Sequence, residues 1–439
     1  MKRIAVITTF NEILEAFSLC RVVRLQLKGL LEHGYPCTFV ACDGCVASGV
    51  FADPRLQQFR IPVASMDPDD APAQHDVSFL ALVKKIRKKL RPLIARTDVA
   101  ITHDILYLPH FLAYNQACRE LARDFPNVLW LHWVHSVPHQ PQDYAEHDPR
   151  VLRFRGFPNG IFVYPNVSDI PLVTRQFAVS DHQVRIVPHT FDYSEAFHFH
   201  PITAALIERF DLYSPDVLAI YPVRLDRGKQ PEKLVRLFAA IKKAGRSVRL
   251  LILNFHSTGD HFIEYRDEIH REARSLGLTA DELVFSNEIE SLPGLDGELV
   301  RRCQVEMPHQ VIMDLFHLTN LHVHPSAAET YSLVCQEAAA CGNLLVVNED
   351  FPPMRSVYGD DVVGVNFCSI HRTTTYQPGE TEYYDQAAKR ILASLDSNPI
   401  HQQRVRIRQT RNPNAVFRNY IEPLLLDVPQ AQSATAVGG

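Results

Sequence analysis

The sequence lacks any long apolar segment. No run of about 18 apolar residues occurs, so no membrane-spanning helix is predicted. The first ten residues, MKRIAVITTF, also lack the apolar region and the small-residue cleavage site of a secretory signal. A cytoplasmic location is therefore the expectation.

An excess of charge of one sign and a regular cysteine spacing are missing as well. The formal net charge is -5 and the pI about 6.5, which gives no support for general nucleic-acid binding. The nine cysteines are scattered, and an odd number fits a reducing compartment better than a disulfide framework. The segment Cys42-Asp-Gly-Cys45 is a lone pair, whereas a structural zinc site needs about four ligands.

Histidine, in contrast, is abundant, with 21 residues. So many histidines form clusters by chance, and we expect no essential metal. The clusters in question are His132, His135 and His139, and His317, His322 and His324.

Short apolar runs alternate with helical stretches along most of the chain. Strands alternating with helices predict an α/β fold in which helices cover both faces of parallel sheets. The predicted strands lie at 4–10, 37–41, 98–102, 128–131, 161–164 and 184–187, and then at 217–221, 248–253, 321–324 and 344–347. The predicted helices lie at 13–31, 106–123, 232–244, 309–318, 331–341 and 414–426.

The alternation weakens between Tyr193 and Pro215 and restarts at Val217, which predicts two similar halves. The predicted organisation is an amino-terminal Rossmann-like domain at 1–195, a linker at 196–215, a carboxy-terminal Rossmann-like domain at 216–412, a terminal helix at 413–427 and a disordered tail at 428–439.

The strongest chemical signal is a pair of carboxylates eight residues apart, Glu329 and Glu337, in the segment ETYSLVCQE. A strand and turn precede it, so residues 330–333 are predicted to begin a helix. Free backbone N–H groups at a helix start can bind phosphate or hydroxyl oxygens. Glu337, two turns further, could accept hydrogen bonds from a ribose diol, and Glu329 could meet a sugar. The alternative is a helix with two ordinary surface glutamates.

A second signal is the pair of cations Arg224 and Lys229 in the segment YPVRLDRGK, which follows a predicted strand. Two fixed cations can neutralise the negative charge that develops on a leaving diphosphate. Arginine grips phosphate with two hydrogen bonds, and lysine acts as a point charge. The alternative is two solvated surface cations.

Both signals resemble motifs of the retaining GT-B glycosyltransferases of family 4, also called glycosyl transferases group 1. The family's pattern is Pro-Ser-x-x-Glu-Gly-Phe-Gly-Leu-x-x-x-Glu-Ala-x-Ala-x-Gly. Thr330, Tyr331 and Ser332 replace its Gly-Phe-Gly and add side chains to the donor loop. The matching residues are Pro325, Ser326, Glu329, Leu333, Glu337, Ala338, Ala340 and Gly342. The segment from Arg224 to Lys229 resembles the family's Gly-Arg-Leu-x-x-x-Lys-Gly, without the first glycine.

The amino-terminal half resembles the family more loosely. The segment DVAITHD at 98–104 resembles a strand that ends in His-Asp, and VLWLHW resembles the next strand, which ends in a histidine near the acceptor. His132 is the candidate, with His135 as a rival and a buried core histidine as the alternative. The segment VPHTFD at 187–192 resembles the family's Ile-Pro-Asn-Gly-Val-Asp, and the glycine-rich turn after the first strand is absent.

This resemblance implies a GT-B fold, in which two Rossmann-like domains face each other across a cleft. It implies retaining transfer of a hexosyl or related unit from a nucleotide-diphosphate sugar to an acceptor hydroxyl. The catalytic residues would be Glu329, His132, Arg224 and Lys229, and the donor would contact Arg224, Lys229, Thr330, Tyr331, Ser332, Leu333 and Glu337. No cofactor besides the donor substrate is expected.

Three other functions stay open: a sugar-nucleotide epimerase of the same fold, a non-catalytic nucleotide-sugar-binding protein, and a glycosyltransferase acting on modified nucleic-acid bases. The sequence leaves the sugar, the base and the acceptor (glycan, lipid, small molecule or nucleic acid) unspecified. Residues 79–94 form a basic amphipathic helix that could contact a membrane or polyanion, or could simply pack through its apolar stripe.

Overall fold

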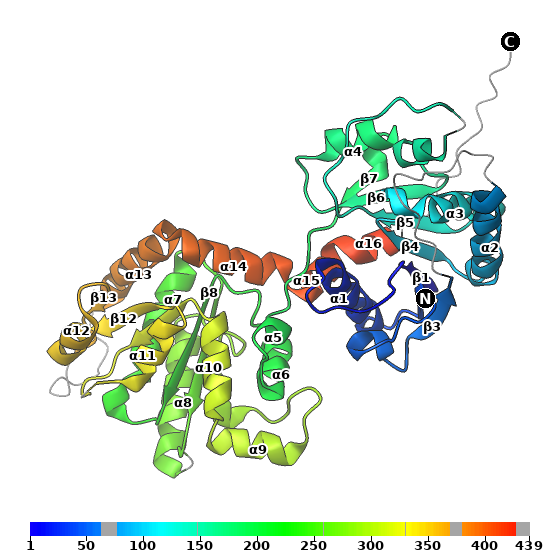
Figure 1. Cartoon of the computed structure of the whole chain (residues 1–439). Helices are drawn as coiled ribbons and strands as arrows, with labels where there is room; N and C mark the ends of the chain where they lie inside the picture. The colour runs from blue at the N-terminus through cyan, green and yellow to red at the C-terminus, as the bar shows by residue number, and fades with distance from the viewer. Residues whose placement is uncertain (63–76, 147, 258, 330, 369–379, 427–439) are drawn as a thin grey trace. The chain divides into compact units, whose positions relative to one another are not determined.

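The computed structural model describes residues 1–62, 77–146, 148–257, 259–329, 331–368 and 380–426 (Figure 1). The chain divides into two compact units. Unit 1 comprises Met1–Thr190 and the chain from Pro413 onward, and unit 2 comprises Phe191–Asn412. The predicted disordered tail at 428–439 lies outside the described residues, as does Thr330.

Unit 1 contains a parallel sheet of seven strands in the order β3-β2-β1-β4-β5-β6-β7 within the described residues. The strands are β1 (Ile4–Ile7), β2 (Cys37–Cys42), β3 (Gln57–Ile61), β4 (Val99–His103), β5 (Leu129–Trp133), β6 (Gly160–Tyr164) and β7 (Val184–Ile186). The helices before Thr190 are α1 (Ser18–Glu32), α2 (Val77–Ile94), α3 (Leu112–Asp124) and α4 (Ile170–Phe177), with short helical turns η1 (Gly49–Ala52), η2 (Pro109–Phe111), η3 (Pro149–Phe154) and η4 (Asp181–Gln183).

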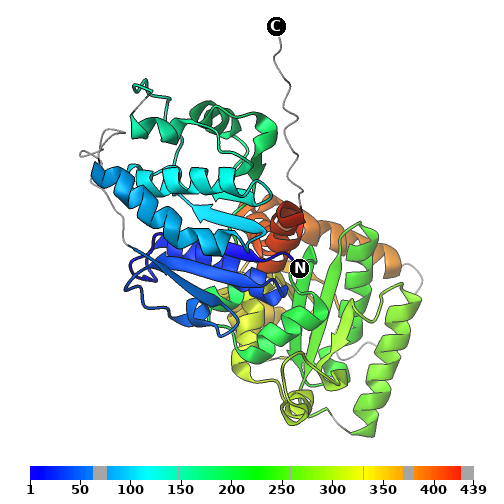
Figure 2. The same cartoon turned by 90° about the vertical axis from the view of Figure 1, so that its right-hand side faces the viewer.

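Side-chain alternation along the strands gives this sheet two apolar faces. Ala5 and Ile7 of β1 face the core formed with α2 and α3. Ile4 and Val6 face the other core, which includes α1. Figure 2 shows α2 and α3, in blue and cyan, running side by side over one face of the sheet. Because both faces are covered, β1, β2, β4 and β5 are buried at every position, whereas the edge strand β3 begins with two exposed glutamines.

The end of the described chain completes the second of these cores. It consists of α15 (Pro413–Val416), the π-helical turn η7 (Phe417–Ile421) and α16 (Glu422–Leu426). α15 contacts α1 (Figure 1). The Phe417 ring stacks on His33 with the ring centres 3.8 Å apart, and Phe417 is 1% exposed.

Unit 2 contains two three-stranded parallel sheets within the described residues, ordered β10-β9-β8 and β11-β12-β13. The strands are β8 (Val217–Val223), β9 (Val248–Asn254), β10 (Leu283–Phe285), β11 (Leu321–His324), β12 (Leu344–Asn348) and β13 (Val363–Val365). The helices are α5 (Tyr193–Ala196), α6 (Pro201–Phe210), α7 (Pro231–Lys243), α8 (Asp260–Ser275), α9 (Gly297–Val305), α10 (His309–Leu318), α11 (Leu333–Ala340), α12 (Pro352–Tyr358), α13 (Glu380–Ser397) and α14 (Pro399–Arg411), with the turns η5 (Arg227–Lys229) and η6 (Ser286–Glu288).

The two sheets of unit 2 meet along β8 and β11. The Asn320 backbone N–H donates to the Leu218 carbonyl (3.2 Å), and the Asn320 side-chain oxygen accepts from the Leu218 N–H (3.0 Å). Across both sheets the strand order is therefore the doubly wound 3-2-1-4-5-6 pattern, as it is for the first six strands of unit 1. The predicted α/β fold class with two Rossmann-like units, the building blocks of the GT-B fold, is confirmed.

The bounds of several predicted elements differ from the structure. The first helix begins at Ser18 rather than at residue 13, and α3 begins at Leu112 because Pro109 opens a separate turn. The predicted linker at 196–215 contains α6, which begins with Pro201 in its first turn and buries Ile202 and Leu206 in the core of unit 2.

The basic amphipathic helix predicted at 79–94 lies within α2, and its apolar stripe is used inside unit 1. Phe79, Val83 and Ile86 are at most 3% exposed in the core. On the polar face, Arg87 pairs with Asp124 of α3 (2.9 Å). The apolar stripe is therefore packed inside unit 1, and contact of the remaining lysines with a membrane or polyanion stays a prediction.

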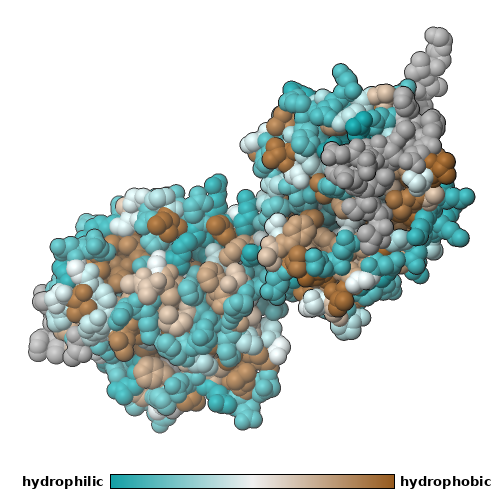
Figure 3. Space-filling view, in the orientation of Figure 1, coloured by the Kyte–Doolittle hydropathy of each residue, from teal (hydrophilic) through white to brown (hydrophobic). Residues whose placement is uncertain are grey.

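The visible face of each unit is mostly hydrophilic, with scattered smaller apolar patches (Figure 3). Among the described residues, no helix has the length and apolar character needed to cross a bilayer.

Truncation of Phe417 tests how much the returning segment stabilises unit 1. Loss of this buried ring should cost about 3–5 kcal/mol of unfolding free energy in Phe417→Ala. Both tryptophans of the chain, Trp130 and Trp133, lie in unit 1, so their fluorescence reports the unfolding of that unit alone. Leu426→Ala, in the same segment but 61% exposed, is the matched control and should change stability by less than about 0.5 kcal/mol. Equal midpoints of unit 1 unfolding in the two variants would contradict this packing.

Candidate functional site

The candidate site lies in unit 2 where the strand order reverses, between β8 and β11. Ligands of doubly wound sheets bind at the carboxyl ends of the strands at such a point. Two loops follow these ends: residues 224–230 after β8, and residues 325–332 after β11. The described residues predicted to bind the donor all lie in these loops or in α11, which follows the second.

Backbone hydrogen bonds connect the two loops. The Ala327 N–H donates to the Gly228 carbonyl (2.8 Å), and the side-chain amide of Gln230 donates to the Pro325 carbonyl (2.7 Å). Buried Tyr221 of β8 donates its hydroxyl to the Lys229 carbonyl (2.8 Å). Gln230 is 2% exposed and has a left-handed backbone (φ 52°), which turns the chain into α7. These contacts hold the Lys229 loop against the Glu329 loop.

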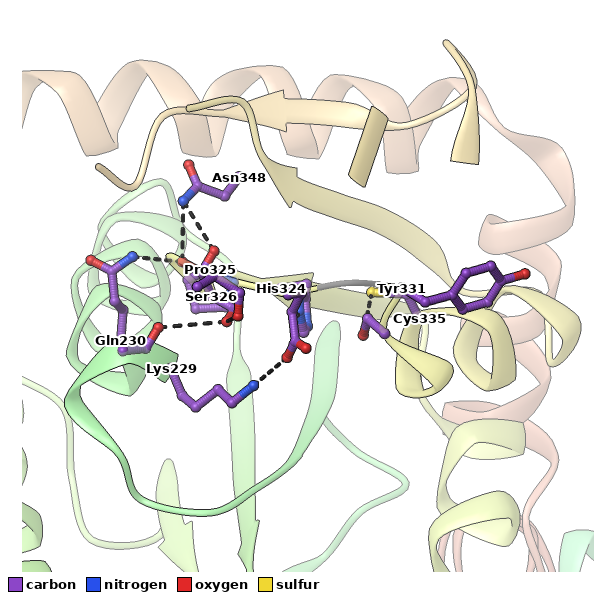
Figure 4. Close-up of polar contacts among 12 residues, drawn as sticks. Lys229, Gln230, His324, Pro325, Ser326, Tyr331, Cys335 and Asn348 are labelled. Carbon is purple, nitrogen blue, oxygen red and sulfur yellow. Dashed lines mark hydrogen bonds and ion pairs between the residues drawn. The ribbon is translucent and has the colours of Figure 1, made fainter. Parts of the chain in front are cut away.

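Asn348, at the end of β12, holds the second loop from the other side. Its side-chain amide donates to the carbonyls of Ser326 (3.2 Å) and Cys368 (2.9 Å), and its side-chain oxygen accepts from the Phe367 N–H (3.0 Å). Figure 4 shows Asn348 and Gln230 on two sides of Pro325 and Ser326. The sequence analysis identified neither Gln230 nor Asn348. For Asn348 the sequence offers one signal, a polar residue at the end of an apolar strand.

Lys229 and Glu329 form an ion pair across the two loops (Figure 4). Both side chains are half-buried, at 27% and 21% exposed. The His324 ring lies 3.7 Å from the Glu329 carboxylate, longer than a hydrogen bond. His324 and then Lys229 lower the pKa of Glu329 to about 2. The carboxylate is therefore ionised at neutral pH, and the pair carries no net charge.

The helix that follows begins later than the sequence predicts. Ser332 has a left-handed backbone (φ 64°), so α11 begins at Leu333, and Tyr331 and Ser332 precede it. No side chain caps this helix start. Tyr331 and Leu333 are 46% and 68% exposed, and the Tyr358 hydroxyl donates to the Ser332 carbonyl (2.6 Å). The uncapped N–H groups are thus available to an anion.

The other predicted donor residues have partners of their own. Glu337 accepts from the ring of His309 (2.8 Å), and its side chain is 26% exposed. Arg224 is 53% exposed and pairs with Asp226 (2.8 Å). The structure therefore brings Lys229 and Glu329 together, whereas Arg224 and Glu337 lie at the surface in separate pairs.

His132, predicted to be catalytic, lies in the core of unit 1 instead. It is 1% exposed, and its ring packs against Phe157 at 4.2 Å between ring centres. Its Nδ1 is hydrogen-bonded to the Thr102 hydroxyl (2.7 Å). A substrate cannot reach this ring, because it projects from the same face of β5 as buried Trp130. The structure thus places His132 as a buried core histidine, the alternative that the sequence left open.

The rival His135 belongs to a group of histidines at the carboxyl edge of the unit 1 sheet. Its Nε2 lies 3.0 Å from Nδ1 of His103, and its ring stacks on His189 at 5.8 Å between centres. Burial lowers the pKa of His135 to about 4, so the ring is neutral at physiological pH. Asp104, left-handed at φ 53°, accepts the His135 backbone N–H (2.9 Å), and burial raises its pKa to about 6.

One further group in unit 2 has the chemistry of metal ligands. This group consists of His322, His324 and Cys335, all of them buried. Each residue offers one ligand atom, and the three atoms lie within 4.8 Å of one another. Burial lowers the pKa of His322 to about 3 and raises that of Cys335 to about 12. Of the histidine cluster that the sequence suggested, His317 is separate and stacks on Phe197.

No protein-family model matches this chain, and no curated protein matches it in sequence. The solved structures similar to it include a glycosyltransferase from Rickettsia africae ESF-5, with 12% identity, 96% of this chain and 98% of that chain covered, and a TM-score of 0.35. A UDP-forming trehalose-phosphate synthase from Burkholderia vietnamiensis has 15% identity, 99% coverage of both chains and a TM-score of 0.36. Anabaena HepE in complex with UDP has 13% identity, 96% and 99% coverage and a TM-score of 0.31. At these values the likeness carries no argument about the activity of this chain.

The raised pKa of Asp104 predicts a pH dependence of the stability of unit 1. The folded state holds the Asp104 proton more tightly than the unfolded chain, so stability is lost as pH rises from about 4 to about 6. A rise in pKa from 3.8 to about 6 corresponds to roughly 3 kcal/mol. Asp104→Asn has nearly the same shape, tolerates the left-handed backbone and cannot ionise.

The measurement is urea unfolding at pH 4 and pH 7, followed by tryptophan fluorescence. Between these values the wild type should lose stability relative to Asp104→Asn, by an amount of the order of 3 kcal/mol. Asp43→Asn, at an exposed carboxylate, is the control and should show the pH dependence of the wild type. Parallel curves for the wild type and Asp104→Asn would show that the buried carboxyl is not the cause.

Proposed function

We propose that this chain is a glycosyltransferase that transfers a sugar from a nucleotide-diphosphate donor to an acceptor hydroxyl with retention of the anomeric configuration. The observation that carries the proposal is the Lys229–Glu329 pair, held beside the uncapped start of α11 where the strand order of unit 2 reverses. The resemblance of the segments 224–229 and 325–342 to the family 4 motifs supports the retaining chemistry.

The donor diphosphate would bind between the Lys229 ammonium and the N–H groups at the start of α11. Both offer positive charge at fixed positions, so little reorganisation is needed when negative charge develops on the leaving phosphate. Exposed Tyr331 and Leu333 precede and begin that helix and would contact the donor from the solvent side. Glu337 would hold the ribose diol after releasing His309.

In the reaction we propose, the acceptor hydroxyl oxygen forms a bond to the anomeric carbon while the bond from that carbon to the phosphate oxygen breaks. The acceptor attacks from the face that the phosphate leaves, and the phosphate oxygen takes the hydroxyl proton. No side chain then needs to act as the base, which agrees with the burial of His132. Glu329 would position the transferred sugar.

The ion pair gives Glu329 a second role, because a diphosphate and the Glu329 carboxylate compete for the same ammonium group. To bind the Lys229 ammonium, the donor must displace the Glu329 carboxylate or share the ammonium with it. The carboxylate therefore weakens the binding of the product nucleotide, which would help the diphosphate to leave after transfer.

Donor binding can be tested with a thermal-shift screen against a panel of nucleotide sugars, because a ligand that binds only the native state raises the Tm. Activity is then measured as nucleoside diphosphate release with and without candidate acceptors. Release that depends on an acceptor supports transfer, whereas epimerised donor without an acceptor identifies an epimerase. Binding with no turnover identifies a nucleotide-sugar-binding protein, and transfer only to a modified-base polynucleotide identifies a nucleic-acid acceptor.

Lys229→Ala should lower kcat by roughly 10²–10³-fold, as the loss of one fixed charge-stabilising donor usually does. Arg224→Ala should act on the same phosphate, so the double variant should lose less than the product of the two single effects. Arg227→Ala is the matched control, because Arg227 lies in the same turn but pairs with Glu268 of α8 (2.8 Å). Lys229→Ala with unchanged kcat would exclude the assigned role.

Glu329→Gln should separate binding from chemistry. Without the competing carboxylate, Lys229 is free for phosphate, so the nucleoside diphosphate should bind several-fold more tightly while kcat falls. Glu337→Ala should instead raise KM with little change in kcat, because a ribose contact is similar in the ground and transition states. Calorimetric titration with the diphosphate measures the first effect, and weaker binding by Glu329→Gln would contradict the competition.

The stereochemistry of the product decides between retention and inversion. NMR of the freshly formed glycoside should show the same anomeric configuration as in the donor. The opposite configuration would overturn both the retaining mechanism and the relation to family 4, while leaving a glycosyltransferase.

A further inference from the structure

We propose that His322, His324 and Cys335 form a binding site for a zinc-class divalent cation, buried beneath the loop that carries Glu329. The site is independent of the proposed transferase activity and goes beyond it. The sequence analysis set these histidines aside, because 21 histidines in one chain make such clusters likely by chance.

The three residues converge from two adjacent elements. His322 and His324 are two apart on β11, so both side chains point to the same face of the strand. Cys335 lies in the first turn of α11, which packs against that face. Figure 4 shows His324 between Lys229 and Cys335, with Tyr331 directed away from them.

The histidine nitrogens are buried without compensation by the protein. Nε2 of His322 and both ring nitrogens of His324 have no hydrogen-bond partner among the described residues, and the two side chains are 0% and 3% exposed. A buried polar atom without a partner costs free energy, and such groups usually have an ion or a water beside them. His322 Nδ1 already contacts the Ile220 carbonyl (3.3 Å), which fixes the ring and leaves Nε2 for a ligand.

The distances suit a small cation. Zinc lies about 2.0–2.1 Å from histidine nitrogen and about 2.3 Å from cysteine sulfur, so ligand atoms around it are roughly 3.3–3.7 Å apart. The three atoms here lie within 4.8 Å of one another, and small side-chain rotations would bring them to these shorter distances. Neutral imidazole is the form of histidine that binds metal.

The ligand types determine which metal ion the site prefers. Imidazole and thiolate favour zinc, whereas magnesium and calcium need oxygen ligands. Three protein ligands leave a fourth tetrahedral position for water. A bound cation would connect the end of β11 to the first turn of α11, the two anchors of the loop at 325–332. It would therefore fix the loop that presents Glu329.

The experiment uses the full chain, stripped with a chelator and titrated with zinc or cobalt. Zinc should bind at one equivalent per chain and raise the Tm. Cobalt should give the near-ultraviolet charge-transfer band of a thiolate ligand, and the loss of this band in Cys335→Ser would assign the thiolate independently of any activity. Zinc binding in competition with a chromophoric chelator gives the affinity.

Cys335→Ser and His324→Gln should each weaken zinc binding by at least about 100-fold and should abolish the thiolate band or reduce the cobalt affinity. Cys341→Ser, a half-buried cysteine at the end of α11, and His317→Gln in α10 are the matched controls and should bind zinc as the wild type does. If Cys335→Ser fails to fold, the loss of zinc and cobalt binding in His324→Gln still decides. Absence of stoichiometric zinc, cobalt binding without the thiolate band, or an equal loss in Cys341→Ser would each overturn the proposal.

Discussion

The contact between the loops after β8 and β11 is the constraint on which the candidate site depends. The two loops belong to strands 98 residues apart in sequence, from the end of β8 to the start of β11. One backbone hydrogen bond, from Ala327 to Gly228, and one buried amide, that of Gln230, bring them together. Buried hydrogen bonds of this kind are costly to break, because each broken bond leaves an unsatisfied group. Lys229 and Glu329 meet only because the backbones that carry them are fixed first.

The electrostatics of the site follow from that contact. A lone half-buried ammonium would attract any anion, and a lone carboxylate beside a diphosphate site would repel the donor. As a pair the two side chains are neutral until a phosphate arrives, and the start of α11 adds partial positive charge beside them. Selectivity for a diphosphate over simple anions then requires a ligand that can satisfy the lysine and the helix start together.

The sequence predicts the elements of this fold better than it predicts the site. The bounds of α10 and β11 agree with the prediction, because Pro308, Thr319-Asn320 and Pro325 interrupt the chain on either side of the two elements. α6 was missed, although Pro201 in its first turn is a usual start signal. The burial of His132 could have been inferred, because it lies two residues after Trp130 in a strand and therefore on the same face as that large apolar side chain. The roles of Gln230 and Asn348 could not, since each depends on backbone groups of distant segments.

The residues that begin and end unit 1 lie far apart in the sequence. Val416, Phe417 and Ile421 complete a core with α1, yet all 222 residues of unit 2, Phe191–Asn412, separate them from the first part of that unit. During synthesis, unit 2 therefore leaves the ribosome whole before the core of unit 1 can close. Until then the part of α1 around Gly29 and His33, which Phe417 contacts, stays uncovered. Domains usually complete in the order in which they are translated. In this protein the second domain can be finished first, and a nascent chain cut short before Pro413 would carry an incomplete first domain beside a complete second one.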